Sequence, residues 1–243
     1  MFQCRADFVS FDGMRNTKIP ADPNKAPATS RRTPTRRLKE TPLQEEDWIK
    51  AATDILADEN FRGIRIDALC KRLGVTKGSF YWHFKGRPQL LSALLVHWRQ
   101  RMTTNVIKRL TALGGNPTQR LRALFRLPHQ PKSPKFARVE QSVRDWARNA
   151  DYAQEAVQEV DELRLDYFRT LLEQHGLRGE IVEKRAYIAY AIVMGDSILR
   201  ETLAKDSCRD AITDEVMQLL TQDESGKADT EKWAIPTGTL PKN

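Results

Sequence analysis

The feature that most constrains the fold of this chain is residues 64–84, Ile-Arg-Ile-Asp-Ala-Leu-Cys-Lys-Arg-Leu-Gly-Val-Thr-Lys-Gly-Ser-Phe-Tyr-Trp-His-Phe. Leu69 and Leu73 give the first part of this segment the apolar face of a short helix. Gly74 supplies a turn position that favours left-handed backbone, and Thr76 is a good N-cap for a second short helix. This pattern predicts a helix-turn-helix, a motif whose second helix enters the major groove of DNA.

Composition narrows the class of protein. The chain has 243 residues, of which 40% are hydrophobic, enough to bury a substantial core. No apolar run approaches the roughly 20 residues that a membrane helix needs, and the start of the chain lacks a compact apolar signal segment. We therefore expect a cytoplasmic protein with no membrane partner. Cys4, Cys70 and Cys208 are far apart and lack metal-ligand spacing, so we expect no disulfide framework, metal or cofactor.

The net charge of +8 is concentrated near the start of the chain. Residues 1–42 hold nine Lys and Arg against four Asp and Glu, together with five prolines, which predicts a disordered basic N-terminal arm. This arm either follows DNA phosphates or enters a minor groove, or it is a solvated linker. Met14 is an alternative start. Residues 222–243 are predicted to form a flexible polar C-terminal tail.

From Leu43 onward the apolar residues recur at helical spacing, which predicts an all-α fold. Residues 43–86 are expected to form a three-helix head that contains the helix-turn-helix, and residues 87–221 a larger helical domain. A long helix is expected to begin at Pro88 and to connect the two. The helix expected at about residues 180–203 is apolar on more than one side, so it is either central to its domain or part of a subunit interface.

The chain resembles the TetR family of bacterial transcriptional regulators over about residues 45–98. The resemblance rests on Ala51-Ala52, Asp67-Ala68-Leu69, the run from Leu73 to Phe84, Arg87 and Leu90-Leu91. Two positions depart from the family pattern. The family usually has Gly where Asn60 stands, for which Asn is a tolerable substitute. It usually has Thr or Ser near Arg65, whose guanidinium can reach a phosphate but cannot accept the backbone N–H bonds of a helix cap.

The resemblance and the motif together predict which side chains contact an operator in double-stranded DNA. Lys77 starts the recognition helix with a donor for guanine or phosphate, and Gly78 permits close approach of the backbone. Tyr81 and His83 resemble positions of the family that hold phosphates, and Trp82 resembles one that contacts bases. The predicted contacts are Arg65, Thr76, Lys77, Gly78, Ser79, Tyr81, Trp82, His83 and Lys85. Phe80 and Phe84 are expected to pack inside the head.

The resemblance also implies a homodimer formed through the last two long helices, at residues 180–203 and 207–221. The candidate interface residues are Tyr187, Tyr190, Ala191, Met194, Ile198 and Leu199. Two such subunits would place two heads on half-sites about 34–36 Å apart. A buried central helix in a monomer is the alternative reading of the same apolar surface.

A small-molecule effector is the third partner that the resemblance implies. The candidate pocket residues are apolar and aromatic side chains of the middle helices, Trp98, Met102, Phe125, Phe136, Trp146, Tyr167 and Phe168. Four arginines either favour an anionic ligand or form a solvated helix face, namely Arg122, Arg126, Arg138 and Arg144.

These features predict a sequence-specific transcriptional regulator, a repressor released from a palindromic operator by a ligand. One alternative is a DNA-binding dimer without an inducer, whose C-terminal helices serve only for dimerisation or protein recruitment. Another is a sequence-blind binder that depends on the basic arm. The sequence predicts no enzyme, because it has no Gly-rich phosphate loop after a strand, no His-Glu-x-x-His and no Cys-His cluster.

Overall fold

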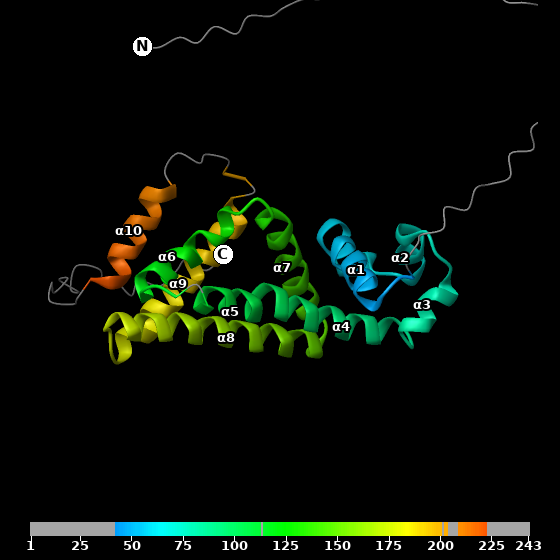
Figure 1. Ribbon diagram of the computed structural model, residues 1–243, viewed down its shortest axis with the longest axis horizontal. Helices are drawn as coiled ribbons and strands as arrows, with labels where there is room; N and C mark the ends of the chain where they lie inside the picture. The colour runs from blue at the N-terminus through cyan, green and yellow to red at the C-terminus, as the bar shows by residue number, and fades with distance from the viewer. Residues whose placement is uncertain (1–41, 113, 201, 204–208, 223–243) are drawn as a thin grey trace, which may run out of the picture. The chain divides into compact units, whose positions relative to one another are not determined.

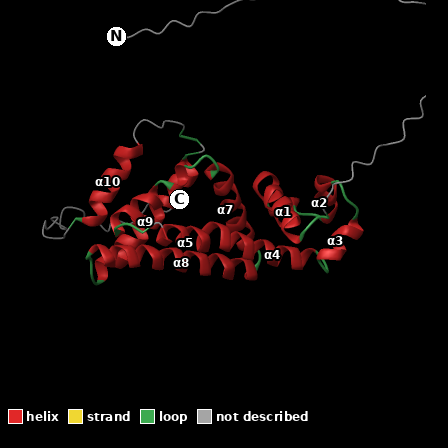
Figure 2. Ribbon diagram, in the orientation of Figure 1, coloured by secondary structure: helices red, strands yellow, loops and turns green. Residues whose placement is uncertain are grey.

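Every regular element in the described part of the chain is a helix, which confirms the predicted all-α fold (Figure 2). The computed structural model describes residues 42–112, 114–200, 202–203 and 209–222. The predicted N-terminal arm, the alternative start at Met14 and the tail beyond residue 222 lie outside these residues.

The head is built from three short helices and one turn. They are α1 (Glu45–Glu59), the 3-10 turn η1 (Phe61–Gly63), α2 (Ile66–Leu73) and α3 (Lys77–His83). Three acidic residues in the first turn of α1 complement the positive end of its dipole, and the Gln44 backbone N–H donates to the Asp47 carboxylate at 2.9 Å. The recognition helix α3 ends at His83, with Phe84 as its C-cap.

Two residues with positive φ set the turns of the head. Asn60, between α1 and η1, has a φ of 61°, and its side-chain oxygen accepts a hydrogen bond from the Arg62 backbone N–H at 2.9 Å. Gly74 ends α2 in the left-handed region with a φ of 70°. The turn predicted at Gly74 is confirmed, and Asn60 ends α1 at a position where the family pattern has Gly.

The larger helical part follows without a break. It comprises α4 (Arg87–Arg99), the π-helical turn η2 (Gln100–Thr104), α5 (Asn105–Ala112), α6 (Pro117–Phe125), the 3-10 turn η3 (Leu127–His129), α7 (Ser133–Ala147), α8 (Asp151–His175), α9 (Glu180–Leu199) and α10 (Arg209–Thr221). Helix α8 packs against α4, α6, α7 and α9 (Figure 1). One side of α8 therefore packs against helices from both ends of this part, while its other side is exposed.

The helix that was predicted to begin at Pro88 is interrupted. It runs as α4 to Arg99, then takes one π-helical turn over residues 100–104 before it continues as α5. A π-turn inserts an extra residue into the helical ladder and often marks a functional position. Here the turn includes Met102 and Thr103, which line a cavity.

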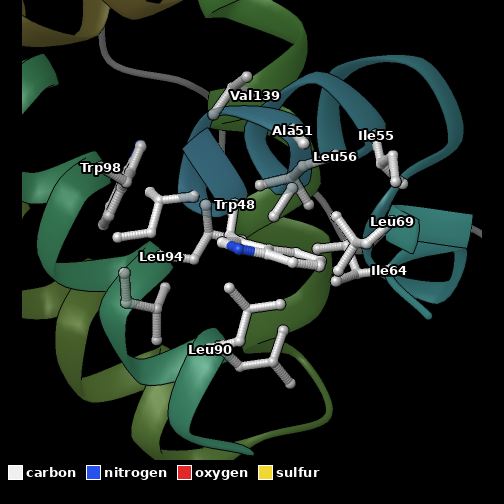
Figure 3. Packing of buried hydrophobic residues seen from close by; sticks show 14 of the residues in the cluster. Trp48, Ala51, Ile55, Leu56, Ile64, Leu69, Leu90, Leu94, Trp98 and Val139 are labelled. Carbon is white, nitrogen blue, oxygen red and sulfur yellow. The ribbon is translucent and has the colours of Figure 1, made fainter. Parts of the chain in front are cut away.

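One hydrophobic cluster joins the head to the helices behind it. Trp48 of α1 is fully buried and meets Phe80 of α3 edge to face, with ring centroids 5.4 Å apart. Figure 3 shows Trp48 lying near Leu90 and Leu94 of α4. The same cluster includes Val139 of α7, so the head core continues into the larger part.

A second hydrophobic cluster fills the far part of the molecule between α6, α8, α9 and α10. It includes Leu121, Phe168, Leu171, Ala189 and Leu220. The cavity described below shares side chains with this cluster. None of the described helices is both long and apolar enough to cross a membrane.

Candidate DNA-binding surface and ligand cavity

Helix α3 divides its aromatic residues between the core and the surface. Phe80 and Phe84 are buried, as predicted, and stack on each other at 5.5 Å. Tyr81 and Trp82, the two residues that follow Phe80, are 56% and 87% exposed. Large exposed aromatic side chains on a helix that is otherwise anchored are typical of a contact surface for a partner.

The structure leaves most of the predicted DNA contacts accessible. Ser79 and His83 are half-buried, and the His83 ring lies 6.2 Å from the buried Trp48 ring. The exposed members of the set are Arg65, Thr76, Lys77, Gly78, Tyr81, Trp82 and Lys85. The prediction that these residues contact DNA is compatible with this exposure.

At the two N-cap positions of the motif, neither side chain forms a capping hydrogen bond. Arg65 is the N-cap of α2 and its side chain makes no cap hydrogen bond, as expected for a guanidinium. Thr76 is the N-cap of α3, but its hydroxyl makes no cap bond either, so the predicted capping role of Thr76 is wrong. The Ser79 backbone N–H donates instead to the Thr76 backbone carbonyl at 3.1 Å. The exposed hydroxyl is thereby left for an external partner.

An ion pair bridges the two helices of the motif. The Lys77 ammonium lies 2.7 Å from the Asp67 carboxylate in the first turn of α2. The hydrogen bond and the negative charge of Asp67 raise the pKa of Lys77. Both side chains are exposed, so the pair is weak and a phosphate can compete for the ammonium.

Arg87 ties the motif to α4. Its Nε donates to the backbone carbonyl of Ile64 at 2.6 Å, and its guanidinium lies 4.8 Å from the centre of the Phe61 ring. The residues around these contacts start α2. Sequence reasoning included Arg87 in the resemblance but assigned it no role. Because Arg87 is the first residue of α4, its contacts hold the segment just before α2 against the start of α4.

A cavity of about 820 Å³ lies in the larger helical part. Four of the seven predicted pocket residues line it, Met102, Phe136, Tyr167 and Phe168. The Tyr167 phenol oxygen is buried and has no hydrogen-bond partner in the described part of the chain. It can therefore form a hydrogen bond with a bound molecule.

The other three predicted pocket residues do not line the cavity. Trp98 and Trp146 belong to the first hydrophobic cluster, which the head shares with α4, α7 and α8. In this cluster Trp146 stacks on Phe61 with ring centroids 4.5 Å apart. Phe125 is buried in the second cluster, 6.3 Å from Phe168. Helical spacing indicates that an aromatic residue is buried, but not whether it faces a core or a cavity.

A buried ionic network forms one wall of the cavity. The Arg164 guanidinium of α8 donates to both carboxylate oxygens of Glu140 of α7, at 2.9 and 3.1 Å, and to the Thr103 hydroxyl of η2 at 3.0 Å. Arg144 pairs with Asp161 at 2.5 Å and also with Glu140 at 2.9 Å. We name these five residues and Tyr190 the buried network.

Tyr190 and Trp98 connect the network to α9 and α4. The Tyr190 hydroxyl donates to Asp161 at 2.6 Å and accepts from Arg144 and Arg164, each at 3.1 Å. The Trp98 indole N–H donates to Glu140 at 3.2 Å. The network therefore links the cavity wall to the helix that carries the head.

The network carries two positive and two negative side chains. Burial by itself raises the pKa of Glu140, but the guanidinium groups of Arg164 and Arg144 outweigh burial and hold this pKa below its usual range. The pKa of Asp161 is lowered against burial by hydrogen bonds from Arg144 and Tyr190. Burial raises the pKa of Tyr190 to about 12, so its hydroxyl is neutral.

Sequence reasoning missed the pairing of Glu140 with Arg164, although one signal was present. Arg164 stands four residues after Val160 and four before Phe168, both buried, so it lies on the buried side of α8. A charged residue at such a position needs a partner. Of the four arginines considered for an anionic ligand, Arg144 is in the network, Arg122 pairs with Asp214, and none of the four lines the cavity.

The predicted dimer interface divides into two sets. Tyr187, Ile198 and Leu199 are exposed large apolar residues of α9, and Ala191 beside them is exposed as well. Tyr190 and Met194 instead line the cavity, where Tyr190 is buried in the network and Met194 is half-buried. Their assignment to the interface stays a prediction. Helix α9 is apolar on several sides because one side faces the cavity and another is exposed.

Sequence comparison with known proteins finds matches to the head, and structural comparison finds matches to the whole fold. Residues 49–94 match the family model described as bacterial regulatory proteins, tetR family. The tetracycline repressor protein class C of Escherichia coli is 42% identical over 52 residues, which are 21% of this chain and 24% of that protein. The chain thus matches about a quarter of the length of this relative.

Solved structures match over a longer span. A transcriptional regulator from Rhodococcus has a TM-score of 0.62 at 19% identity and covers 73% of this chain and 96% of its own. A regulator from Saccharomonospora viridis in complex with choline has a TM-score of 0.60 at 15% identity, over 74% and 96% of the two chains. The regulator FadR from Bacillus subtilis in complex with stearoyl-CoA has a TM-score of 0.56 at 16% identity, over 74% and 98%. At such identities these likenesses show the fold alone.

The two kinds of comparison agree with the geometry of the motif. The family match includes the recognition helix and the first turns of α4, and the fold match includes the helices that follow. Members of this family are DNA-binding regulatory proteins rather than enzymes. Residues 49–94 are thus a domain of the TetR family of bacterial regulatory proteins, and the helices that follow have the fold of solved transcriptional regulators.

Proposed function

We propose that this protein is a homodimeric transcriptional repressor of the cytoplasm that binds a palindromic operator and is released by a small molecule. The observation that carries this proposal is the recognition helix. Helix α3 is anchored in the core by Phe80, while Tyr81 and Trp82 stand exposed beside Lys77. Aromatic and basic side chains on the second helix of this motif have the chemistry to contact phosphates and base edges.

The proposed dimer follows from the exposed apolar residues of the last helices. Tyr187 and Ile198 of α9, together with Ile212 and Leu219 of α10, are each about half or more exposed. A patch of this kind is typical of a subunit interface, and a two-fold interface repeats the same patch on both partners. Two heads held by such a dimer would read two half-sites of a palindrome.

Ligand control is proposed from the cavity and its connection to α4. The cavity volume of about 820 Å³ lies within the range of small-molecule sites. Thr103 of the π-turn belongs to the buried network that walls the cavity, and Trp98 of α4 is hydrogen-bonded to the network through Glu140. A ligand that binds better to another arrangement of this wall would populate a conformation in which α4 and the head are placed differently. Operator binding would then be weaker.

The alternative is a DNA-binding dimer without an inducer. A helical domain that only dimerises has no need of a cavity of this size, so the cavity favours ligand control. The choline and stearoyl-CoA complexes of the two fold neighbours show that proteins of this fold can hold small molecules. Their ligands differ in chemistry, so neither is assigned to this chain.

The test is selection of bound sequences from random duplex DNA by the purified protein. We expect a palindromic motif with half-sites about one helical turn apart. A Trp82→Ala variant should lose the motif, and a Lys184→Ala variant should keep it, because Lys184 is an exposed residue of α9 outside the motif. Salt-sensitive binding without any motif would overturn the proposal in favour of a sequence-blind binder.

A further inference from the structure

We propose that the cavity takes an amphipathic anion, with an apolar body inside and an anionic headgroup at the opening. Four basic side chains would hold the headgroup, Arg101, Lys108, Arg109 and Lys132. This inference deepens the proposed function, because it names the chemical class of the effector. The inference rests on the proposed function in one respect: it assumes that the molecule bound in the cavity is the effector.

The walls of the cavity suit an apolar body. Met102, Val106, Leu127, Phe136 and Phe168 line it and come from η2, α5, η3, α7 and α8. Burial of apolar ligand surface against such walls favours binding, offset by the entropy lost on association. The Tyr167 phenol, which has no partner in the described part of the chain, adds at most one neutral hydrogen bond. The interior therefore favours hydrocarbon or aromatic groups.

The charged groups in the cavity wall have no capacity left for a headgroup. Glu140 is the one acidic residue among the lining side chains, and it already accepts from Arg164, Arg144 and Trp98. Each guanidinium nitrogen of Arg164 has a partner as well, Thr103, Tyr190 or Glu140. Withdrawing one of these partners would strand a buried charge. A charged headgroup is therefore excluded from the buried network.

The opening of the cavity carries basic side chains that no acidic side chain in the described part of the chain neutralises. Arg101, Lys108, Arg109 and Lys132 are lining residues that are also exposed, which places them where the cavity meets solvent. None of them forms an ion pair with another described residue. Other basic residues from the same part of the chain do, since Arg99, Arg122 and Lys135 pair with Glu159, Asp214 and Asp54.

This positive opening is not a consequence of overall composition. Residues 43–243 hold 31 Lys and Arg against 28 Asp and Glu, a nearly even balance. The lining of the cavity holds five basic residues and one acidic residue. The origin is a run from residue 68 to residue 139 that contains fifteen Lys and Arg and no Asp or Glu. A cleft lined by one sign of charge attracts the opposite charge and repels its own.

Arg101 marks the boundary between the two parts of the site. Its guanidinium lies 5.3 Å from the centre of the Phe136 ring, a wall residue, while the side chain remains exposed. An arginine that rests on an aromatic face keeps its outer N–H groups free for a carboxylate or phosphate. The apolar wall would contact the apolar body of an amphipathic anion, and Arg101, next to the solvent, would contact its headgroup.

The test uses four probes that share a twelve-carbon chain and differ in headgroup. Dodecanoate, dodecyl phosphate, dodecanol and dodecyltrimethylammonium are titrated into the full-length protein by calorimetry, each below its micelle concentration. We expect an anionic probe to bind at least about ten-fold more tightly than the cationic probe, since ten-fold corresponds to about 1.4 kcal/mol. The preference between dodecanoate and dodecyl phosphate then identifies the headgroup.

Variants locate the binding to the opening. The double variants K108Q/R109Q and R101Q/K132Q should each weaken dodecanoate binding about five-fold or more and leave dodecanol binding unchanged. The control is R148Q, which removes an exposed arginine outside the cavity lining and should bind dodecanoate as the wild type does. All substituted residues are exposed, so the fold is expected to persist, and far-ultraviolet circular dichroism checks it.

Three results would overturn the inference. They are cationic binding as tight as anionic binding, unchanged dodecanoate affinity in both double variants, and no binding of any probe. The DNA selection on the same preparation keeps the two proposals distinguishable. A palindromic motif with no preference for anionic probes removes the inference alone, whereas anion binding without a motif removes the repressor function and leaves the site assignment standing.

Discussion

The recognition helix and the buried network both contain ion pairs, but they hold them in opposite environments. In the Lys77–Asp67 pair the side chains are 60% and 74% exposed, whereas in the Arg164–Glu140 pair they are 14% and 6% exposed. An exposed pair contributes little to stability and can exchange its partner for a phosphate at small cost. A buried pair cannot lose one member without stranding the other charge. We therefore expect substitutions in the first region to affect binding and removal of one partner in the second region to reduce stability.

The largest effect is expected from breaking the buried pair. Glu140→Gln should lower the free energy of unfolding by about 3–5 kcal/mol, because the charges of Arg164 and Arg144 lose their shared carboxylate. Urea denaturation measures the loss. Glu159→Gln is the matched control, since Glu159 pairs with Arg99 at the surface and should lose at most about 1 kcal/mol. Equal losses in both variants would mean that the network does not stabilise the fold.

Acid should remove the same stabilisation in the wild type. The pKa values of Glu140 and Asp161 are lowered in the folded state, so their contribution is full above the unfolded carboxyl pKa of about 4 and is lost as the pH falls through the lowered values. The stability difference between wild type and Glu140→Gln should therefore be constant near neutral pH and shrink below about pH 4. Urea midpoints over a pH series measure it. A difference that grows on acidification would contradict the lowered pKa of Glu140.

An intermediate effect is expected at the exposed face of α9. Tyr187→Glu should weaken dimerisation by about 2 kcal/mol, the size typical of a central aromatic interface residue, while leaving the fold of the subunit intact. Sedimentation equilibrium measures the dissociation constant. Tyr190→Phe serves as the internal comparison, because it changes a buried hydroxyl of the network on the same helix. A larger effect on dimerisation from Tyr190→Phe would place the interface on the other side of α9.

The smallest change in free energy is expected on the recognition helix, although it decides function. Lys77→Ala should weaken operator binding by about 1 kcal/mol and reduce the salt dependence of binding, because one ammonium contact to DNA is removed. Its stability should stay within about 0.5 kcal/mol of the wild type, since the side chain is exposed. Fluorescence anisotropy on the selected operator at several salt concentrations measures both. Unchanged operator affinity together with lower stability would mean that the Lys77–Asp67 pair stabilises the fold and does not bind DNA.

The helix-turn-helix was predictable because its signals are local. The apolar residue Leu69, the turn residue Gly74 and the buried Phe80 lie within one short segment, and each acts on the backbone or on a neighbour a few residues away. The turn at Asn60 follows from the same kind of local preference. One local prediction failed, the cap by Thr76, because a backbone carbonyl accepts the available N–H instead.

The cavity was predictable only in part. Met102 and Phe136 face it, while Trp98 and Trp146 pack in the core, although all four are apolar or aromatic residues at helical spacing. For Met102 the π-turn at residues 100–104 contributes to this outcome, since an extra residue in a helical turn changes the direction of its side chains. No spacing rule for a regular helix anticipates such a turn.

The sequence by itself determined the all-α fold, the turn at Gly74 and the aromatic pair of α3, because these depend on backbone preferences and on periodicity along one segment. Only the tertiary structure decided that Glu140 meets Arg164, that Tyr190 faces inward, and that four basic residues without an ion pair among the described residues gather at one opening. Glu140 and Arg164 are 24 residues apart and sit on different helices, so their contact depends on how α7 packs on α8. Packing of this kind is a property of several segments together, and no single segment of sequence contains it.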